Sequence, residues 1–306
     1  MKLRFFGVRG SVPRPMNGAE IYRRLRARLN GKPLTPRDLG RFKADGTLGY
    51  GGNTSCLLLE HEGNRLILDA GTGLRGLASH YQRRPSEPVH LLLTHLHWDH
   101  IQGLPFFMPI YQAGREVHIY SAIPAAEIRR SLSVQHSAPF FPVEFHKLLS
   151  RFKFHHLGAA GTLIGAFRVD SLRLHHPQPC YSYKLSAGGK SLVHMSDTAL
   201  ADLAEADFAN YRRFVRGAEA VVADAQFEFT AAALTYRDWG HSCSQYFVEL
   251  LAGTGVPRLV LFHYNPQSGD EQIDSELRRA RAYLKMWRPD VKLRIQGAIE
   301  GAVLAL

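Results

Sequence analysis

Short apolar runs, separated by polar and turn-forming residues, recur along the chain and predict β-strands. The N-terminal residues 1–7 have the pattern of one such strand. The other predicted strands span residues 57–59, 65–69, 89–94, 117–120, 191–195, 220–223 and 258–262.

Two later segments are predicted to be helices. One spans residues 242–252, with Ser242 as a plausible N-cap and Gly253 or Gly255 ending the helix. Since strands and helices alternate in two successions, we expect an α/β fold, a sandwich of two mixed β-sheets with helices on both outer faces. The second helix, over residues 272–287, has the spacing of an amphipathic helix, with apolar positions at Ile273, Leu277, Ala280, Leu284 and Trp287.

One segment, residues 13–49, differs in composition from the rest of the chain and is interpreted as an insertion. Its middle, from about Glu20 to Leu29, can be helical because apolar residues recur at a spacing of four. No repeat or low-complexity segment interrupts the remainder, so a single domain over residues 1–306 is expected. The insertion is bounded by Pro13, Pro15, Pro33 and Pro36.

The composition is that of an ordinary globular protein, with 45% hydrophobic and 21% charged residues. The N-terminus lacks the apolar core of about 7–15 residues that a signal peptide requires. No apolar run reaches the roughly 18 residues of a membrane span. These features predict a cytoplasmic protein that does not cross a membrane. Three widely spaced cysteines, Cys56, Cys180 and Cys243, predict no disulfide framework.

The net charge of +11 favours anionic partners such as nucleotides, nucleic acid or phosphate esters. A solvated basic surface would account for the charge equally well. Part of the excess lies in the insertion and part on the predicted late helix. These residues are Arg23, Arg24, Arg26, Arg28, Lys32, Arg37, Arg41 and Lys43, and then Arg278, Arg279, Arg281 and Lys285.

Four potential metal ligands occupy six positions directly after the apolar strand that ends near Thr94. His95 and His97 are two residues apart in extended chain, so both can bind one cation. Asp99 and His100 follow where the chain turns and can face a second cation. Imidazole together with carboxylate suits Zn²⁺, Mn²⁺ or Fe²⁺ better than Ca²⁺ or Mg²⁺.

This run resembles the His-x-His-x-Asp-His signature of the metallo-β-lactamase superfamily, whose fold is an αββα sandwich. The segment 67–73 resembles the first motif of the superfamily, in which an aspartate, here Asp69, orients the ligand-bearing loop. Segments 7–13 and 50–56 resemble a branch near the class-III-type cyclic-nucleotide phosphodiesterases and the tRNA 3′-processing endonucleases. The resemblance implies a hydrolase with two divalent metal ions, foremost Zn²⁺.

Further ligands are expected from three distant segments. Strand alternation places His176 on the apolar face, whereas His175 faces the other side. Asp197, at the end of a strand, resembles the carboxylate that bridges both metals, although it could instead cap a following helix. The resemblance thus implies His95, His97 and His176 on one ion, Asp99, His100 and His263 on the other, and Asp197 between them.

The reaction depends on residues outside the ligand set. The segment around His241 resembles an element of the same branch in which a histidine protonates the leaving oxygen, and Asp224 resembles its acidic partner. We count Asp99 with these two as catalytic. A hydroxide held between the ions would attack phosphorus. Weaker candidates for substrate contact are Arg9, Asn53 and Asn265.

The favoured function is therefore phosphodiester hydrolysis of a cyclic nucleotide or a short oligonucleotide. Two other reactions stay open: endonucleolytic cleavage of tRNA-like RNA, and hydrolysis of acyl or lactone substrates. A non-catalytic binding module is a third alternative, against which the complete ligand set argues. A homodimer is compatible with the resemblance. The insertion is expected near the mouth of the site, where it would restrict substrate size.

Overall fold

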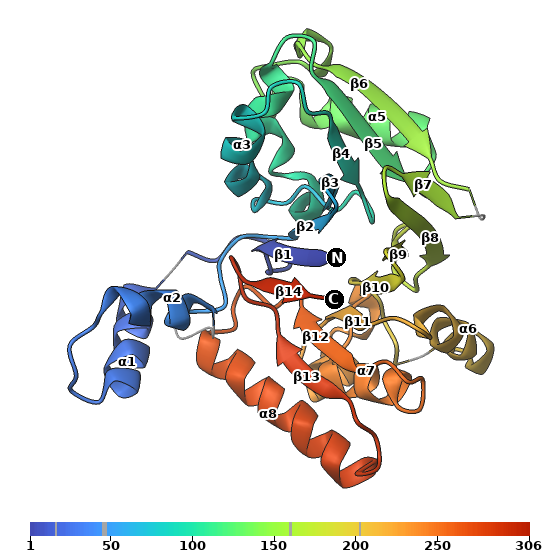
Figure 1. Ribbon diagram of the computed structural model, residues 1–306. Helices are drawn as coiled ribbons and strands as arrows, with labels where there is room; N and C mark the ends of the chain where they lie inside the picture. Colours follow the sequence, from blue (N-terminus) through green and yellow to red (C-terminus); the bar gives the residue numbers. More distant parts are fainter. Residues whose placement is uncertain (16, 45–47, 159–160, 202) are drawn as a thin grey trace.

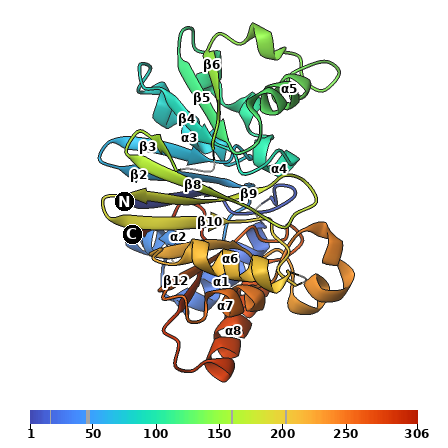
Figure 2. The same cartoon turned by 90° about the vertical axis from the view of Figure 1, so that its right-hand side faces the viewer.

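The computed structural model describes residues 1–306 apart from 16, 45–47, 159–160 and 202. Two mixed β-sheets pack face to face between two layers of helices (Figures 1 and 2), which confirms the predicted fold class. In the first sheet the order is β14 (Val303–Ala305), β1 (Lys2–Gly7), β2 (Cys56–His61), β3 (Asn64–Leu68), β4 (Val89–Leu92), β5 (Glu116–Ser121) and β6 (Arg151–His156). In the second it is β13 (Arg294–Gly297), β12 (Arg258–Phe262), β11 (Ala220–Asp224), β10 (Lys190–Met195), β9 (Tyr181–Ala187), β8 (Phe167–Arg173) and β7 (Thr162–Ile164).

Each sheet combines an antiparallel part with a parallel part. Strands β3 to β6 run parallel in the first sheet, and β10 to β13 run parallel in the second. Because parallel strands end at the same edge of a sheet, the loops that follow them are neighbours in space. The loops after β4, β10, β11 and β12 carry most of the predicted site residues.

Helices cover the outer face of each sheet (Figures 1 and 2). The buried residues of α3 and α5 pack with Ile67 and Leu91, which point away from the second sheet. The alternate positions Leu66 and Leu68 belong to the core between the sheets. The first layer holds α3 (Leu74–Gln82), α4 (Trp98–Ile101) and α5 (Ala125–Gln135), and the second α6 (Glu205–Val215), α7 (Ser244–Leu251) and α8 (Asp270–Trp287).

Both predicted late helices exist, with two corrections. Trp287 is 43% exposed, because it is the last residue of α8, and its ring stacks on Tyr283. Ser242 is not an N-cap, since α7 begins at Ser244 and Cys243 precedes it without a side-chain cap. Instead the Ser242 hydroxyl donates to the Thr198 carbonyl at 2.6 Å and so ties the chain before α7 to the loop after β10.

The insertion forms two helices, α1 (Gly18–Leu29) and α2 (Pro36–Ala44), beside α8 (Figure 1). The first was predicted, but its buried residue is Glu20, which accepts a hydrogen bond from the Asp270 backbone at 2.6 Å. Arg24 pairs with Asp274 of α8 at 2.9 Å. The contacts of the insertion thus reach the start of α8, and its basic residue Lys43 has a side chain outside the described part.

The two ends of the chain lie side by side, because β1 pairs with β14 (Figure 1). All three cysteines are buried and unpaired. Among the described helices, none combines the length and the hydropathy needed to cross a membrane.

Candidate metal centre

The seven predicted metal ligands come from both sheets and meet at one edge of the sandwich. Those of the first sheet follow β4, and α4 starts within their run. Those of the second sheet follow β8, β10 and β12. In chain order they are His95, His97, Asp99 and His100, and then His176, Asp197 and His263.

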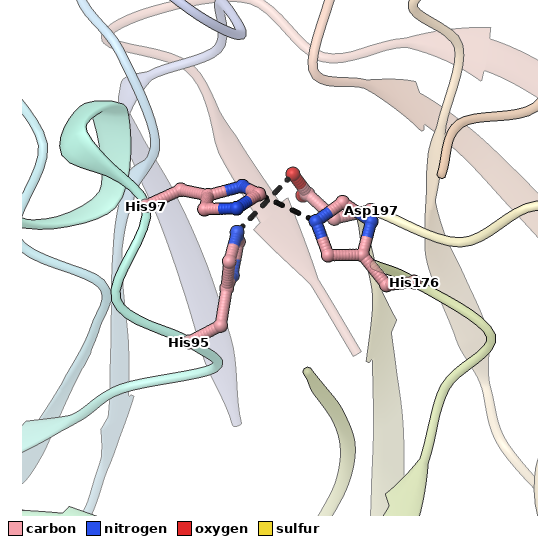
Figure 3. Close-up of side chains that lie close together, drawn as sticks. All are labelled: His95, His97, His176 and Asp197. Carbon is pink, nitrogen blue, oxygen red and sulfur yellow. Dashed lines mark hydrogen bonds and ion pairs between the residues drawn. The ribbon is translucent and has the colours of Figure 1, made fainter. Parts of the chain in front are cut away.

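The first ligand group joins three imidazoles and one carboxylate. One potential ligand atom from each of His95, His97, His176 and Asp197 lies within 4.8 Å of the others. Figure 3 shows these side chains pointing toward one another, with His176 Nε2 at 3.2 Å from His97 Nδ1 and His95 Nε2 at 3.6 Å from Asp197 Oδ2. Three of the four are buried, and His97 is half-buried.

The second group contains Asp99, His100, His263 and again Asp197, with the same mutual distance limit of 4.8 Å. His263 Nε2 lies 3.0 Å from Asp99 Oδ2 and 3.4 Å from Asp197 Oδ2. His100 Nε2 lies 3.3 Å from the same Asp197 oxygen. Since Asp197 belongs to both groups, its carboxylate is placed between them.

Hydrogen bonds on the outer ring nitrogens fix how three imidazoles are oriented. His176 Nδ1 lies 2.9 Å from the Gly240 carbonyl, which can only accept, so this nitrogen carries the proton. His100 Nδ1 donates to Asp69 Oδ2 at 2.8 Å, and His95 Nδ1 contacts the Thr94 hydroxyl at 3.0 Å. A proton on Nδ1 leaves the Nε2 lone pair directed into the ligand groups, as metal-binding histidines require.

Backbone strain concentrates at the same place. Asp69, Asp197 and His263 adopt φ values of 58°, 57° and 58°, a left-handed conformation that costs residues with a Cβ about 1–2 kcal/mol. Such residues persist where the surroundings over-determine them, and they cluster at functional sites. Gly10 allows close packing against this site, because a Cβ there would lie 2.5 Å from His263 Nδ1.

Burial and charge divide the imidazoles into two kinds. Burial lowers the pKa of His176 to about 4 and lowers the pKa of His95 well below its usual value. Burial alone would also lower the pKa of His100, but the carboxylates of Asp197 and Asp99 raise it well above the usual value. Conversely, burial would raise the pKa of Asp197, yet the surrounding imidazoles lower it strongly. The site thus keeps its carboxylates ionised and favours positive charge beside them.

Two buried polar atoms test whether a metal fits. Asp197 Oδ1 and His95 Nε2 are buried and find no hydrogen-bond partner in the described part of the chain. A buried carboxylate oxygen and a buried imidazole nitrogen without partners are costly unless a cation satisfies them. The donor set of neutral imidazoles and carboxylates therefore fits divalent metal ions of the zinc, manganese or iron type.

Asp224 and His241 lie beside both ligand groups. Asp224 ends β11, and its Oδ2 accepts from His241 Nδ1 at 2.8 Å. The His241 ring centroid lies 5.5 Å from that of His176 and 5.2 Å from that of His263. Asp224 Oδ1 also approaches His263 Nδ1 at 3.9 Å, so one carboxylate faces a predicted ligand and its predicted catalytic neighbour.

Three weaker sequence candidates have structural partners instead of an open position. Arg9 is wrong as a substrate contact, because it is fully buried, and its Nε donates to the Gly51 carbonyl at 2.8 Å. The Asn53 amide donates to Glu300, and the Asn265 side chain accepts from the Gln267 backbone.

The alternative role of Asp197 as a helix cap is excluded, since the next helix, α6, begins only at Glu205.

Sequence reasoning missed Ser11, whose backbone N–H donates to Asp99 Oδ2 at 2.7 Å. Its only signal was its place in a segment, 7–13, that resembles a family motif. His175 is exposed and belongs to neither ligand group.

Comparison with known proteins places these features in a family. The family model described as "Beta-lactamase superfamily domain" matches residues 64–264. Ribonuclease Z of Staphylococcus aureus is 26% identical over 138 residues, which are 43% of this chain and 42% of that protein. The chain thus spans less than half the length of this curated relative.

Two solved structures share the fold over almost the entire chain. The metallo-β-lactamase fold protein YhfI from Bacillus subtilis has a TM-score of 0.64 at 17% identity, covering 99% of this chain and 98% of that one. Unliganded yeast PDE1 has a TM-score of 0.66 at 14% identity, covering 100% and 99%.

Proposed function

The chain belongs to the β-lactamase superfamily and has the metallo-β-lactamase fold of a hydrolase, and we propose that it hydrolyses phosphodiesters, with a cyclic nucleotide or a short oligonucleotide as substrate. One observation carries this proposal: the hydrogen-bonded pair Asp224–His241 lies against both ligand groups without belonging to the seven ligands. A leaving alkoxide needs a proton, and this pair can supply one.

In this proposal two divalent ions, foremost Zn²⁺, complete the site. They would polarise the phosphoryl group as Lewis acids and supply a nucleophile from water at neutral pH. The ligands would be His95, His97 and His176 for one ion, Asp99, His100 and His263 for the other, and Asp197 for both.

His241 acts as the general acid. Its Nδ1–H is bound to Asp224, so Nε2 is the nitrogen that holds a proton for the leaving oxygen. Asp224 is itself fixed, because its Oδ1 accepts from the Gln226 backbone at 3.0 Å. Asp99 is anchored in the same way by the Ser11 N–H, which keeps its carboxylate oriented toward the second ligand group.

Two further features support a phosphodiester over a neutral ester or a lactone. The net charge of +11 attracts anionic substrates. The matched relative is named as a ribonuclease, an enzyme class that cleaves phosphodiester bonds in RNA. Cleavage of RNA is for the same reason the second candidate function.

The test compares His241→Ala with the wild type on substrates whose leaving groups differ in their need for protonation. We expect kcat/KM for a cyclic nucleotide to fall about 100- to 10,000-fold, the usual contribution of a general acid. The loss on bis(p-nitrophenyl) phosphate should be much smaller, because p-nitrophenolate leaves without protonation. Metal content, measured on the same preparations, should stay unchanged.

His175→Ala is the matched control, since this exposed histidine lies next to a predicted ligand but outside both groups. Equal losses on both substrates would show that His241 is not the acid. The same panel includes a tRNA precursor and a homoserine lactone. Turnover of the lactone and of no phosphodiester would overturn the proposed function.

A further inference from the structure

Three aromatic side chains, Phe227, Tyr236 and Trp239, form a cluster beside His241, on the chain between β11 and α7. Phe227 and Tyr236 lie nearly parallel, with ring centroids 4.6 Å apart and an interplanar angle of 21°. The Trp239 ring is tilted by 57° against Tyr236, with ring centroids 4.8 Å apart, and the Phe227 ring centroid lies 5.8 Å from that of His241. The cluster therefore connects the proposed general acid to the indole of Trp239.

Trp239 is the exposed member of this cluster. It is 60% exposed, whereas Phe227 is only 5% exposed. The indole is thus supported on one side by rings and presents much of its surface to solvent. In contrast, Trp98, which is 55% exposed within the ligand run, has no ring contact in the described part of the chain.

The backbone holds this open ring at a fixed place relative to the ligand groups. Gly240, between Trp239 and His241, has a φ of 80°, and its carbonyl accepts from His176 Nδ1. A Cβ at Gly240 would lie 2.2 Å from that same nitrogen, so no other residue fits without displacement. Consequently the backbone next to Trp239 is tied to the ring of His176.

We propose that Trp239, supported by Tyr236 and Phe227, stacks on a planar aromatic group of the departing alcohol, and that this group is a nucleobase. The inference rests on the proposed function, because His241 marks the side from which the alcohol leaves. A nucleotide combines the negative charge that a basic protein attracts with a flat π-face that can stack on an indole. The structure thus assigns one nucleoside of the substrate to the His241 side.

The test uses a dinucleoside monophosphate and two versions of it, each lacking one base, with product analysis to show which nucleoside departs. Trp239→Ala should raise KM for the intact dinucleotide about tenfold, as expected for the loss of one base stack, with kcat changed less than about twofold. The variant should not affect KM for the version that lacks the departing base. Trp239→Phe should restore most of the affinity, since a ring remains.

Trp287→Ala is the matched control, because this indole is also exposed and also stacked on a tyrosine, but on α8. An equal rise of KM with and without the departing base would overturn the proposal. So would a fall in kcat at unchanged KM, since Trp239 would then merely support His241.

A second readout does not depend on turnover. Quenching of tryptophan fluorescence by adenosine monophosphate, but not by ribose 5-phosphate, should disappear in Trp239→Ala. If the wild type hydrolyses no phosphodiester, the proposed function fails, while this binding comparison still decides on the stacking site. Equal quenching by both ligands would contradict it.

Discussion

A single buried carboxylate organises the ligand run without belonging to either ligand group. Asp69 accepts from the Thr94 backbone at 2.9 Å and from the Ser55 hydroxyl at 3.1 Å, in addition to His100 Nδ1. Burial would raise the pKa of Asp69, but His100 and His194 lower it well below the usual value. The charge on Asp69 therefore persists at neutral pH and polarises the His100 ring.

Replacement of this carboxylate should weaken metal binding. We expect Asp69→Ala to reduce metal affinity about 10- to 100-fold, the range typical of partners that orient a ligand histidine. Competition with a chromogenic chelator measures this directly. Asp290→Ala, at an exposed aspartate, provides the control. Unchanged affinity in Asp69→Ala would mean that Thr94 and the fold alone orient His100.

The sequence predicted which residues come together at the site where ligand chemistry and spacing coincide, as at His95 to His100. The prediction for Arg9 failed, because a charged side chain next to a motif gives no sign that the core encloses it. Ser11 was missed because it contributes a backbone N–H, which every residue except proline possesses. Trp239 carried no signal either, since exposure of a large aromatic ring is known only from the fold.

At the scale of elements, most strands with consecutive apolar residues were predicted, whereas β6 and β9, in which apolar and polar residues are mixed, were not. β11 is buried along its entire length, and its sequence shows this plainly. β9 alternates between buried and half-buried positions, so its sequence, YSYKLSA, resembles a polar loop. The start of α7 was predicted two residues early, because Ser242 uses its hydroxyl in a tertiary contact with the loop after β10.

The two ends of the insertion meet at one point of the sandwich, so the segment can be removed and its ends joined. The Arg14 N–H donates to the Gly52 carbonyl at 2.8 Å, so the two ends of the segment are already side by side. We expect replacement of residues 16–49 by a short glycine linker to broaden the substrate range, measured over the phosphodiester panel, and to leave the metal content unchanged.

Stability should nevertheless fall, because the Asp270 N–H loses its bond to Glu20 and Asp274 loses its pairing with Arg24. A lower Tm with full metal loading is therefore the expected outcome. Loss of metal on deletion would contradict the prediction, since every predicted ligand lies outside the segment.

At the scale of the molecule, the net charge of +11 predicts that the binding of nucleic acid depends on the salt concentration. If single-stranded RNA contacts about four cationic groups, a fourfold rise in salt should weaken its binding roughly fiftyfold. Filter binding over a salt titration measures the slope. The double variant Arg23→Ala and Arg26→Ala changes two exposed residues of α1. It should reduce the slope of log affinity against log salt concentration by about 0.7 for each phosphate that the variant no longer neutralises.

Lys190→Ala, at a lysine that pairs with Glu219, is the control. A slope near zero would show that the positive charge merely solvates the surface.

The predicted metal ligands come from both sheets, but the residues proposed to act on the substrate come from one half of the chain. The half with β1 to β6 contributes the compact ligand run, whereas Asp224, His241 and Trp239 all belong to the half with β7 to β13. The stretch between β11 and α7 contains His241 and Trp239 but none of the seven predicted metal ligands, so changes in it can alter the proposed substrate contacts without removing a ligand. Chimaeras that exchange only the stretch between β11 and α7 between relatives would then acquire the substrate specificity of the protein that donates this stretch.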